Sequence, residues 1–170
     1  MHIETKSAMF LYDFGLNNQR SIELDVKRGK RVYDTVHMDK GEGKTHFKVK
    51  TDFFNMIKEK YSHQKIFFIT TELQQLYNPF YSELYDQDIK YKLDICVVFF
   101  HKTRNPVVLD VEIDGKEHYT ERGRWKAEVR DDWMKERYNV DTFRVDQFDP
   151  SPNKFMQDFC SRIDYRIHCC

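Results

Sequence analysis

The stretch Val107-Val108-Leu109-Asp110-Val111-Glu112-Ile113-Asp114 alternates apolar and acidic side chains. Successive side chains of a β-strand point to opposite faces, so Leu109, Val111 and Ile113 would share one face and the three carboxylates the other. Like charges on one strand face repel one another unless a cation lies among them. The stretch therefore predicts a strand with a core face and an acidic face, whose oxygen atoms suit a divalent metal ion.

The strand before it is predicted at 89–100 and contains Asp94. A symmetric hairpin turn between the two strands would set Asp94 opposite Ile113, on the apolar face. A slip of one residue would set it opposite Glu112 or Asp114 instead, on the acidic face. The sequence leaves both registers open, and each brings Asp94 close to the carboxylates.

A short polar stretch, Gly115-Lys116-Glu117-His118-Tyr119, follows the acidic strand. Gly115 allows a sharp turn, which would bring Lys116 and His118 to the end of the sheet where the carboxylates lie. A lysine there would stabilise the charge of a phosphate group. A neutral histidine would accept a proton near neutral pH, so both side chains are candidates for catalysis.

A strongly charged helix is predicted over 121–138. Its basic residues Arg122, Lys126 and Arg130 are spaced four positions apart and share one face, which we expect to contact nucleic-acid phosphates. An adjoining apolar stripe is expected to pack on the sheet. This stripe consists of Trp125, Val129 and Trp133.

The remaining elements complete a single domain over residues 1–170, of α/β (α+β) class. Residues 1–50 are expected to form a β-rich extension that includes a hairpin, and residues 51–165 are expected to form the core. The extension has predicted strands at 21–26, 31–38 and 46–50. In the rest of the chain, helices are predicted at 51–61, 71–85 and 152–163, and strands at 65–70 and 141–146.

The composition argues against several other classes. Aromatic residues make up 15% of the 170 residues, too many for a disordered chain. The formal net charge is zero, so nucleic-acid binding would depend on where the basic side chains lie. The apolar runs are too short to span a bilayer and the N-terminus lacks a signal-peptide core. We therefore expect an intracellular, cytoplasmic protein with no membrane partner.

Neither a zinc site nor a phosphate-binding loop is predicted. The four cysteines lack the paired spacing of zinc ligands, and Cys96 lies in an apolar run, as expected of a core thiol. The stretch Gly41-Glu42-Gly43-Lys44-Thr45 has Met38 where a P-loop needs its first glycine. Four other histidines show no partner pattern and are expected to be structural or solvated: His37, His46, His63 and His101.

Several motifs together resemble a known family. They are Leu93-Asp94, the run 111–118, Arg130-Asp131 and Thr142-Phe143-Arg144. Over residues 89–146 this arrangement is similar to that of the very-short-patch-repair endonucleases, a branch of the PD-(D/E)XK nuclease superfamily. The resemblance implies a restriction-endonuclease-like core, in which helices flank a mixed central sheet. It also implies Mg²⁺-dependent hydrolysis of phosphodiester bonds in DNA, with Mn²⁺ able to substitute.

The resemblance further implies roles for single residues. Asp94 and Glu112 would be metal ligands, Asp114 would take the second acidic position, and His118 would be the family's histidine. The superfamily lysine, two positions after the glutamate, is Asp114 here. Ala127 stands where relatives often carry an aspartate, and the glycine expected before the last strand is replaced around 138–139.

Two functions remain open at this point. In the first, the chain is a metal-dependent DNA endonuclease, and His118 is favoured over Lys116 as proton acceptor because it needs no pKa shift. In the second, the nuclease fold has lost catalysis and serves as a binding module in a nucleic-acid-processing assembly. The neutral charge and the missing lysine favour the second. Whether the chain forms a homodimer is also left open.

Overall fold

The computed structural model describes most of the predicted core. The described residues are 3–14, 36–64, 67–71, 73, 91–100 and 106–168. Most of the predicted hairpin at 21–38 and most of the predicted helix at 71–85 lie outside these residues. None of the helices in the described ranges combines the length and the apolar character that a membrane span requires.

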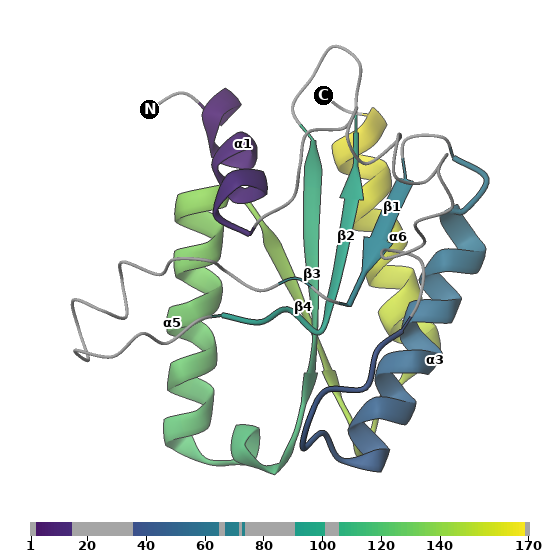
Figure 1. Ribbon diagram of the computed structural model, residues 1–170, viewed down its shortest axis with the longest axis vertical. Coiled ribbons are helices and arrows are strands. Elements are labelled where there is room, and N and C mark those ends of the chain that lie inside the picture. The colour runs from purple at the N-terminus through teal and green to yellow at the C-terminus, as the bar shows by residue number, and fades with distance from the viewer. Residues whose placement is uncertain are drawn as a thin grey trace.

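The order of the helices and strands along the chain can be followed in Figure 1. The helices are α1 (Ile3–Asp13), α3 (Lys44–Tyr61), the 3-10 helix η1 (Lys116–Tyr119), α5 (Glu121–Tyr138) and α6 (Pro152–His168). The strands are β1 (Phe67–Thr70), β2 (Ile95–Phe99), β3 (Val107–Asp114) and β4 (Asp141–Asp146). The predicted bounds of β3, α5 and β4 are confirmed, whereas β2 is shorter and α6 longer than predicted.

The strands form one sheet in the order β1-β2-β3-β4. β1, β2 and β3 pair antiparallel, and β4 is parallel to β3. A parallel pair needs a crossover connection, which α5 supplies. Helices α3 and α6 cover one face of the sheet, and α1 and α5 cover the other (Figure 1). The predicted α/β class, with a mixed sheet between helices, is therefore confirmed.

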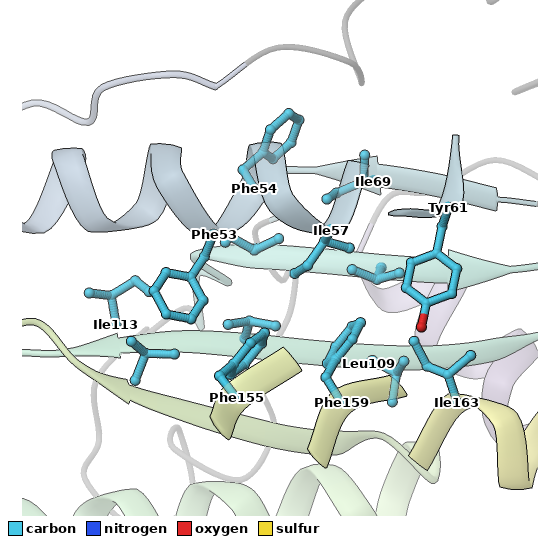
Figure 2. Close-up of a cluster of buried hydrophobic side chains, with 14 of the residues drawn as sticks. Phe53, Phe54, Ile57, Tyr61, Ile69, Leu109, Ile113, Phe155, Phe159 and Ile163 are labelled. Atoms are coloured by element: carbon cyan, nitrogen blue, oxygen red, sulfur yellow. The ribbon is translucent and has the colours of Figure 1, made fainter. Parts of the chain in front are cut away.

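The apolar face of β3 packs into the core beneath α3 and α6 (Figure 2). Leu109 and Ile113 point into this core together with Phe53 of α3 and Phe155 of α6. The rings of Phe53 and Phe155 meet edge to face with centroids 4.7 Å apart, a geometry that aromatic pairs favour. The predicted alternation along β3 is confirmed, because its acidic side chains face the other way.

The predicted contact face of α5 is only partly right: Trp133 packs against the core as predicted, but Trp125 does not. Trp125, which was assigned to the apolar stripe, is 53% exposed. The residues of α5 that are buried are Ala127, Arg130, Met134 and Tyr138. They lie three or four positions apart and so form one stripe against the sheet. α5 turns this side toward the sheet because the acidic face of β3 needs a cation. Hydropathy alone would place that cation, Arg130, on the surface.

The first helix contradicts the predicted β-rich opening of the chain. Residues 3–13 form α1, and Phe10 stacks on Phe14 with ring centroids 4.4 Å apart. Both rings meet Tyr138 of α5 edge to face. Burial of these aromatic rings against a distant helix stabilises α1, and no local pattern reveals it.

The start of α3 also differs from the prediction. Residues 46–50, predicted as a strand, belong to a helix that begins at Lys44. Thr51, predicted to cap the helix, lies inside it and donates from Oγ1 to Phe47 O at 2.8 Å. The described part of the predicted hairpin, residues 36–38, is not a strand.

The end of α5 explains one departure from the resembled family. Asn139, which follows the helix, adopts a left-handed conformation with φ of 56°. Asparagine is one of the few residues besides glycine that take this conformation readily. The turn into β4 therefore needs no glycine.

Candidate active site

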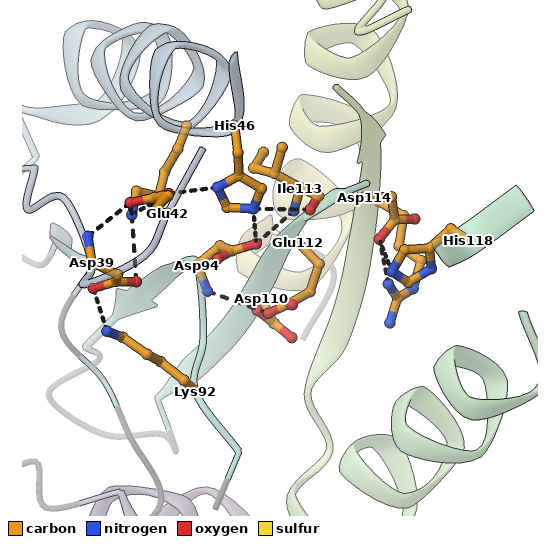
Figure 3. Close-up of polar contacts among 12 residues, drawn as sticks. Asp39, Glu42, His46, Lys92, Asp94, Asp110, Glu112, Ile113, Asp114 and His118 are labelled. Carbon is orange, nitrogen blue, oxygen red and sulfur yellow. Dashed lines mark hydrogen bonds and ion pairs between the residues drawn. The ribbon is translucent and has the colours of Figure 1, made fainter. Parts of the chain in front are cut away.

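Asp94, the residue before β2, lies beside Glu112, which is near the end of β3 (Figure 3). Ile95 pairs with Val111, so Asp94 follows in register opposite Glu112. Glu112 Oε1 accepts from the Asp94 N–H at 3.3 Å, and Asp94 Oδ2 accepts from the Ile113 N–H at 2.8 Å. Of the two registers that the sequence left open, the structure has the slipped one, which puts Asp94 beside the acidic face.

Arg130 lies inside this cluster. Its side chain is 9% exposed, and its Nη2 lies 2.8 Å from both Asp110 Oδ2 and Glu112 Oε1. The guanidinium also stands over the Tyr91 ring, 5.3 Å from the centroid. Arg130 therefore does not share an exposed face with Arg122, and the prediction that it contacts phosphates is corrected. A buried carboxylate needs a partner of opposite charge, and Arg130 serves two of them.

Asp110 and Glu112 compete for that one guanidinium. Burial raises the pKa of the Asp110 carboxyl, and Arg130 opposes the rise. Burial, followed by the charge of Asp110, also raises the pKa of Glu112 well above its ordinary value. Asp110 Oδ1 is buried and has no hydrogen-bond partner within the described part of the chain. The Asp110–Glu112 pair can therefore bind one proton or one further cation.

His46 belongs to the same site, although the sequence analysis gave it no role. Its Nδ1 lies 2.5 Å from Glu42 Oε1, and its Nε2 lies 3.1 Å from Ile113 O and 3.4 Å from Asp94 Oδ2 (Figure 3). All three partners are acceptors, so both ring nitrogens carry protons. The hydrogen bond to Asp94 raises the pKa of His46 to about 9, with burial opposing and Glu42 adding to the rise. His46 is therefore a cation at neutral pH and not a base.

A buried lysine binds the same glutamate that His46 contacts. Lys50 is fully buried in α3 and lies 2.8 Å from the Glu42 carboxylate. Asp39 lies 3.7 Å from the same Nζ and also binds Lys92. A sequence signal for this group exists, because Glu42, His46 and Lys50 are spaced four apart. It was missed because 46–50 was assigned to a strand, in which these side chains could not be neighbours.

Asp114, the last residue of the acidic strand β3, is linked to α5 and β4 by ion pairs. Arg144 donates from Nη1 to Asp114 Oδ1 at 2.6 Å, and from Nε and Nη2 to the two oxygens of Asp131 at 2.7 and 2.8 Å. His118 Nε2 lies 3.1 Å from Asp114 Oδ1. Burial raises the pKa of Asp114, and Arg144 opposes the rise. The structure thus brings Asp114 and His118 together.

The short helix η1 positions Lys116 and His118. Lys116 is exposed and His118 half-buried on this turn. α5 packs so tightly against the turn that a Cβ on Gly123 would lie 1.9 Å from Glu117 O. Glycine is therefore required at 123, and its backbone sets the distance between η1 and the helix.

Clefts open on both sides of the cluster. One of about 310 Å³ is bordered by Asp114, His118, Arg124 and Arg144, among others. The other, of about 460 Å³, is bordered by Asp39, Glu42, His46 and Gln147, among others. Asp94 and Glu112 do not themselves border either cleft, whereas their neighbours Asp114 and His46 do. Arg122 and Lys126, the rest of the predicted basic row, are exposed on α5.

The predicted metal ligands fit a magnesium ion in chemistry and charge. Within the described residues, no group of three or more histidine, cysteine, aspartate or glutamate side chains is arranged to hold a metal ion. Mg²⁺, however, commonly uses one or two carboxylates and completes its shell with water. Asp94 and Glu112 are such a pair. Together with the pair, the five carboxylates of Asp94, Asp110, Glu112, Asp114 and Asp131 outnumber three cationic groups, those of Arg130, Arg144 and His46.

Compared with protein-family models, with curated proteins and with solved structures, the chain matches none of them. The site must therefore be interpreted from its own geometry.

Proposed function

We propose that this chain is a metal-dependent endonuclease that hydrolyses phosphodiester bonds in DNA. The observation that carries the proposal is the junction of Asp94 and Glu112, in which each residue's carboxylate accepts from the backbone of the other strand. These contacts hold both carboxylates before any ligand arrives. Preorganised groups of this kind are what phosphodiester hydrolysis requires. The proposal includes the restriction-endonuclease-like core.

Asp94 and Glu112 would hold the Mg²⁺ or Mn²⁺ ion. When bound, the ion would lower the pKa of a water molecule and stabilise charge on the phosphate. Arg130 limits how far Glu112 moves, because it holds Oε1 at 2.8 Å. His46 does the same for Asp94 from the α3 side, since its Nε2 lies 3.4 Å from Oδ2.

His118 is the proposed proton acceptor. Its Nε2 points to Asp114 Oδ1 at 3.1 Å, so a neutral ring donates its proton there and keeps the lone pair on Nδ1. Nδ1 is then able to accept a proton from the attacking water. Lys116, exposed on the same turn, would stabilise the negative charge that develops on the phosphate.

A second function has a specific observation in its favour. Glu112 and Asp114 are each already paired with an arginine, Arg130 and Arg144. The acidic face of β3 also lacks the superfamily's lysine. A nuclease fold without catalysis would bind nucleic acid in a larger assembly and would tolerate both features.

A plasmid-nicking assay tests the proposal. Supercoiled DNA should be nicked with Mg²⁺ or Mn²⁺ and left intact with EDTA. Glu112→Gln and Asp94→Asn should each lower the rate by about 100-fold or more, because the charge stabilisation from the ion is lost. Asp132→Asn, which changes an exposed carboxylate on α5 outside the cluster, is the matched control and should retain the rate.

The alternatives give different results in the same samples. An inactive binding module would retain DNA binding in EDTA but never nick the plasmid. A protein that neither nicks nor binds DNA would contradict both functions. Nicking that survives Glu112→Gln would show that another site, or a contaminant, cleaves the DNA.

A further inference from the structure

A groove of about 860 Å³ runs along β4, at the edge of the sheet. All six residues from Asp141 to Asp146 line it. Their side chains alternate between the two faces of the sheet, so the groove follows the backbone edge and not one face. Within the described part of the chain, β4 pairs with β3, and its last residue, Asp146, also forms an isolated bridge to Asp149. The opposite wall is α6, which contributes Lys154, Asp158, Arg162 and Tyr165, among others.

β4 is an edge strand with only some of the usual protection against pairing. Edge strands are commonly protected by short length, bulges, proline or charged side chains, especially lysine. β4 has no proline or lysine, and its charged residues are Asp141, Arg144 and Asp146. β4 reads Asp-Thr-Phe-Arg-Val-Asp over six residues. Its one basic side chain, Arg144, directs its guanidinium toward Asp114 and Asp131 and not toward the edge. The free side of β4 is therefore suited to adding another strand.

The start of β4 carries a surplus of positive charge. Asp141 binds two cations, Lys135 at 2.7 Å and Arg166 at 3.0 Å. Arg162 lines the groove one turn of α6 before Arg166 and so adds to the same end. Asp158 also lines the groove, one turn before Arg162, so that two carboxylates face three basic groups at this end.

The end of β4 carries the opposite surplus. Asp146 accepts from the Tyr119 hydroxyl and the Phe148 N–H, which are uncharged. Asp149 lies beside it, at an isolated bridge to Asp146. Lys154, near the start of α6, is the basic residue that lines this end of the groove. The edge of β4 therefore has a positive surplus at its start and a negative surplus at its end.

We propose that β4 pairs antiparallel with β4 of a second copy of this chain, about a two-fold axis between Phe143 and Arg144. This arrangement sets the positive end of each edge against the negative end of the other, whereas a parallel arrangement would oppose like ends. The two sheets would become one, and Tyr165, now 66% exposed, would lie near the junction. The zero net charge of the chain leaves association unopposed.

Sedimentation equilibrium over a range of protein concentrations tests the dimer. Arg162→Glu and Asp149→Lys are exposed changes that reverse one end each. Each should raise the dissociation constant about tenfold, because the two-fold axis duplicates every contact. The double variant restores opposite ends and should recover most of the affinity. Lys60→Glu and Asp132→Lys make the same charge changes at exposed positions away from the groove and should leave the dissociation constant unchanged.

Hydrogen exchange of the β4 peptide distinguishes this dimer from other arrangements. Amides of β4 should gain protection as the protein concentration rises, in parallel with the dimer fraction. A protein that stays monomeric at the highest soluble concentration would overturn the proposal. A dimer whose dissociation constant is unchanged by both charge reversals would also overturn it. Protection of β4 that does not depend on concentration would overturn it as well, because another part of the chain would then cover the edge. Neither measurement depends on nuclease activity.

Discussion

Arg130 Nη2 lies 2.8 Å from Glu112 Oε1, and the side chain that supplies this contact is 9% exposed. A residue that the sequence places on a solvated face of α5 is thus the counter-ion of the candidate catalytic carboxylate. The contact also links the fold to the site, because the same guanidinium joins α5 to the acidic face of β3 through Asp110. Stability and site geometry therefore depend on one group.

Replacing Arg130 with glutamine should destabilise the fold strongly. Two buried carboxylates would lose their shared cation, which should cost about 3–5 kcal/mol of unfolding free energy. Urea unfolding at neutral pH measures the loss. Arg122→Gln, on the exposed part of the same helix, is the matched control and should change stability by less than about 0.5 kcal/mol. Equal effects of the two substitutions would mean that the Arg130 contacts contribute little.

His46 should make stability depend on pH in a defined direction. Its folded pKa is raised to about 9 from 6.5, so the folded protein holds this proton more tightly than the unfolded chain. The stabilisation is fully present below pH 6.5 and is lost as the pH rises through about 9. The difference in unfolding free energy between the protein and His46→Gln should shrink over that interval. His63→Gln, on the exposed turn after α3, is the control and should show no such trend.

Gly123→Ala should destabilise the protein although it improves helix propensity. Alanine in a helix is favoured over glycine by about 1 kcal/mol, but here its Cβ would lie 1.9 Å from Glu117 O. The clash involves backbone, so η1 must shift, and we expect a net loss of about 1–3 kcal/mol. Gly43→Ala, whose Cβ would meet nothing within 4 Å, is the control without a clash and should lose less stability, namely the preference of an N-cap position for glycine over alanine. Thermal unfolding compares them, and a more stable Gly123→Ala variant would refute the tight contact.

The two basic residues that stay exposed on α5 should contribute to DNA affinity. Replacing Arg122 and Lys126 together with glutamine should weaken binding and reduce the slope of log K against log salt by about 1.8, since two counterion-releasing contacts are lost. Fluorescence anisotropy with labelled duplex DNA in EDTA measures the slope without cleavage. Lys60→Gln, exposed on α3, should leave it unchanged. An unaltered slope in the double variant would mark this face as a solvated surface.

The sequence by itself determined the elements whose pattern is local. The alternation in 107–114 predicted β3 and both of its faces, and the predicted bounds of α5 and β4 also agree with the structure. Period-2 and period-3.6 patterns depend on neighbours within one element, so no distant residue is needed to detect them. For the same reason the stretch 111–118 marked Glu112, Asp114 and His118 as a candidate cluster.

Only the tertiary structure decided which charges meet. The register of Asp94 depends on the pairing of two strands, and one residue of slip changes the face on which it lies. His46 contacts Ile113, 67 positions away, and the ammonium group of Lys50 can be buried because it donates a hydrogen bond to Glu42. Arg130 turns inward because an unpaired buried carboxylate costs more than the burial of a paired arginine. Such preferences appear only when distant parts of the chain are brought together, because the energy belongs to the pair and not to either residue.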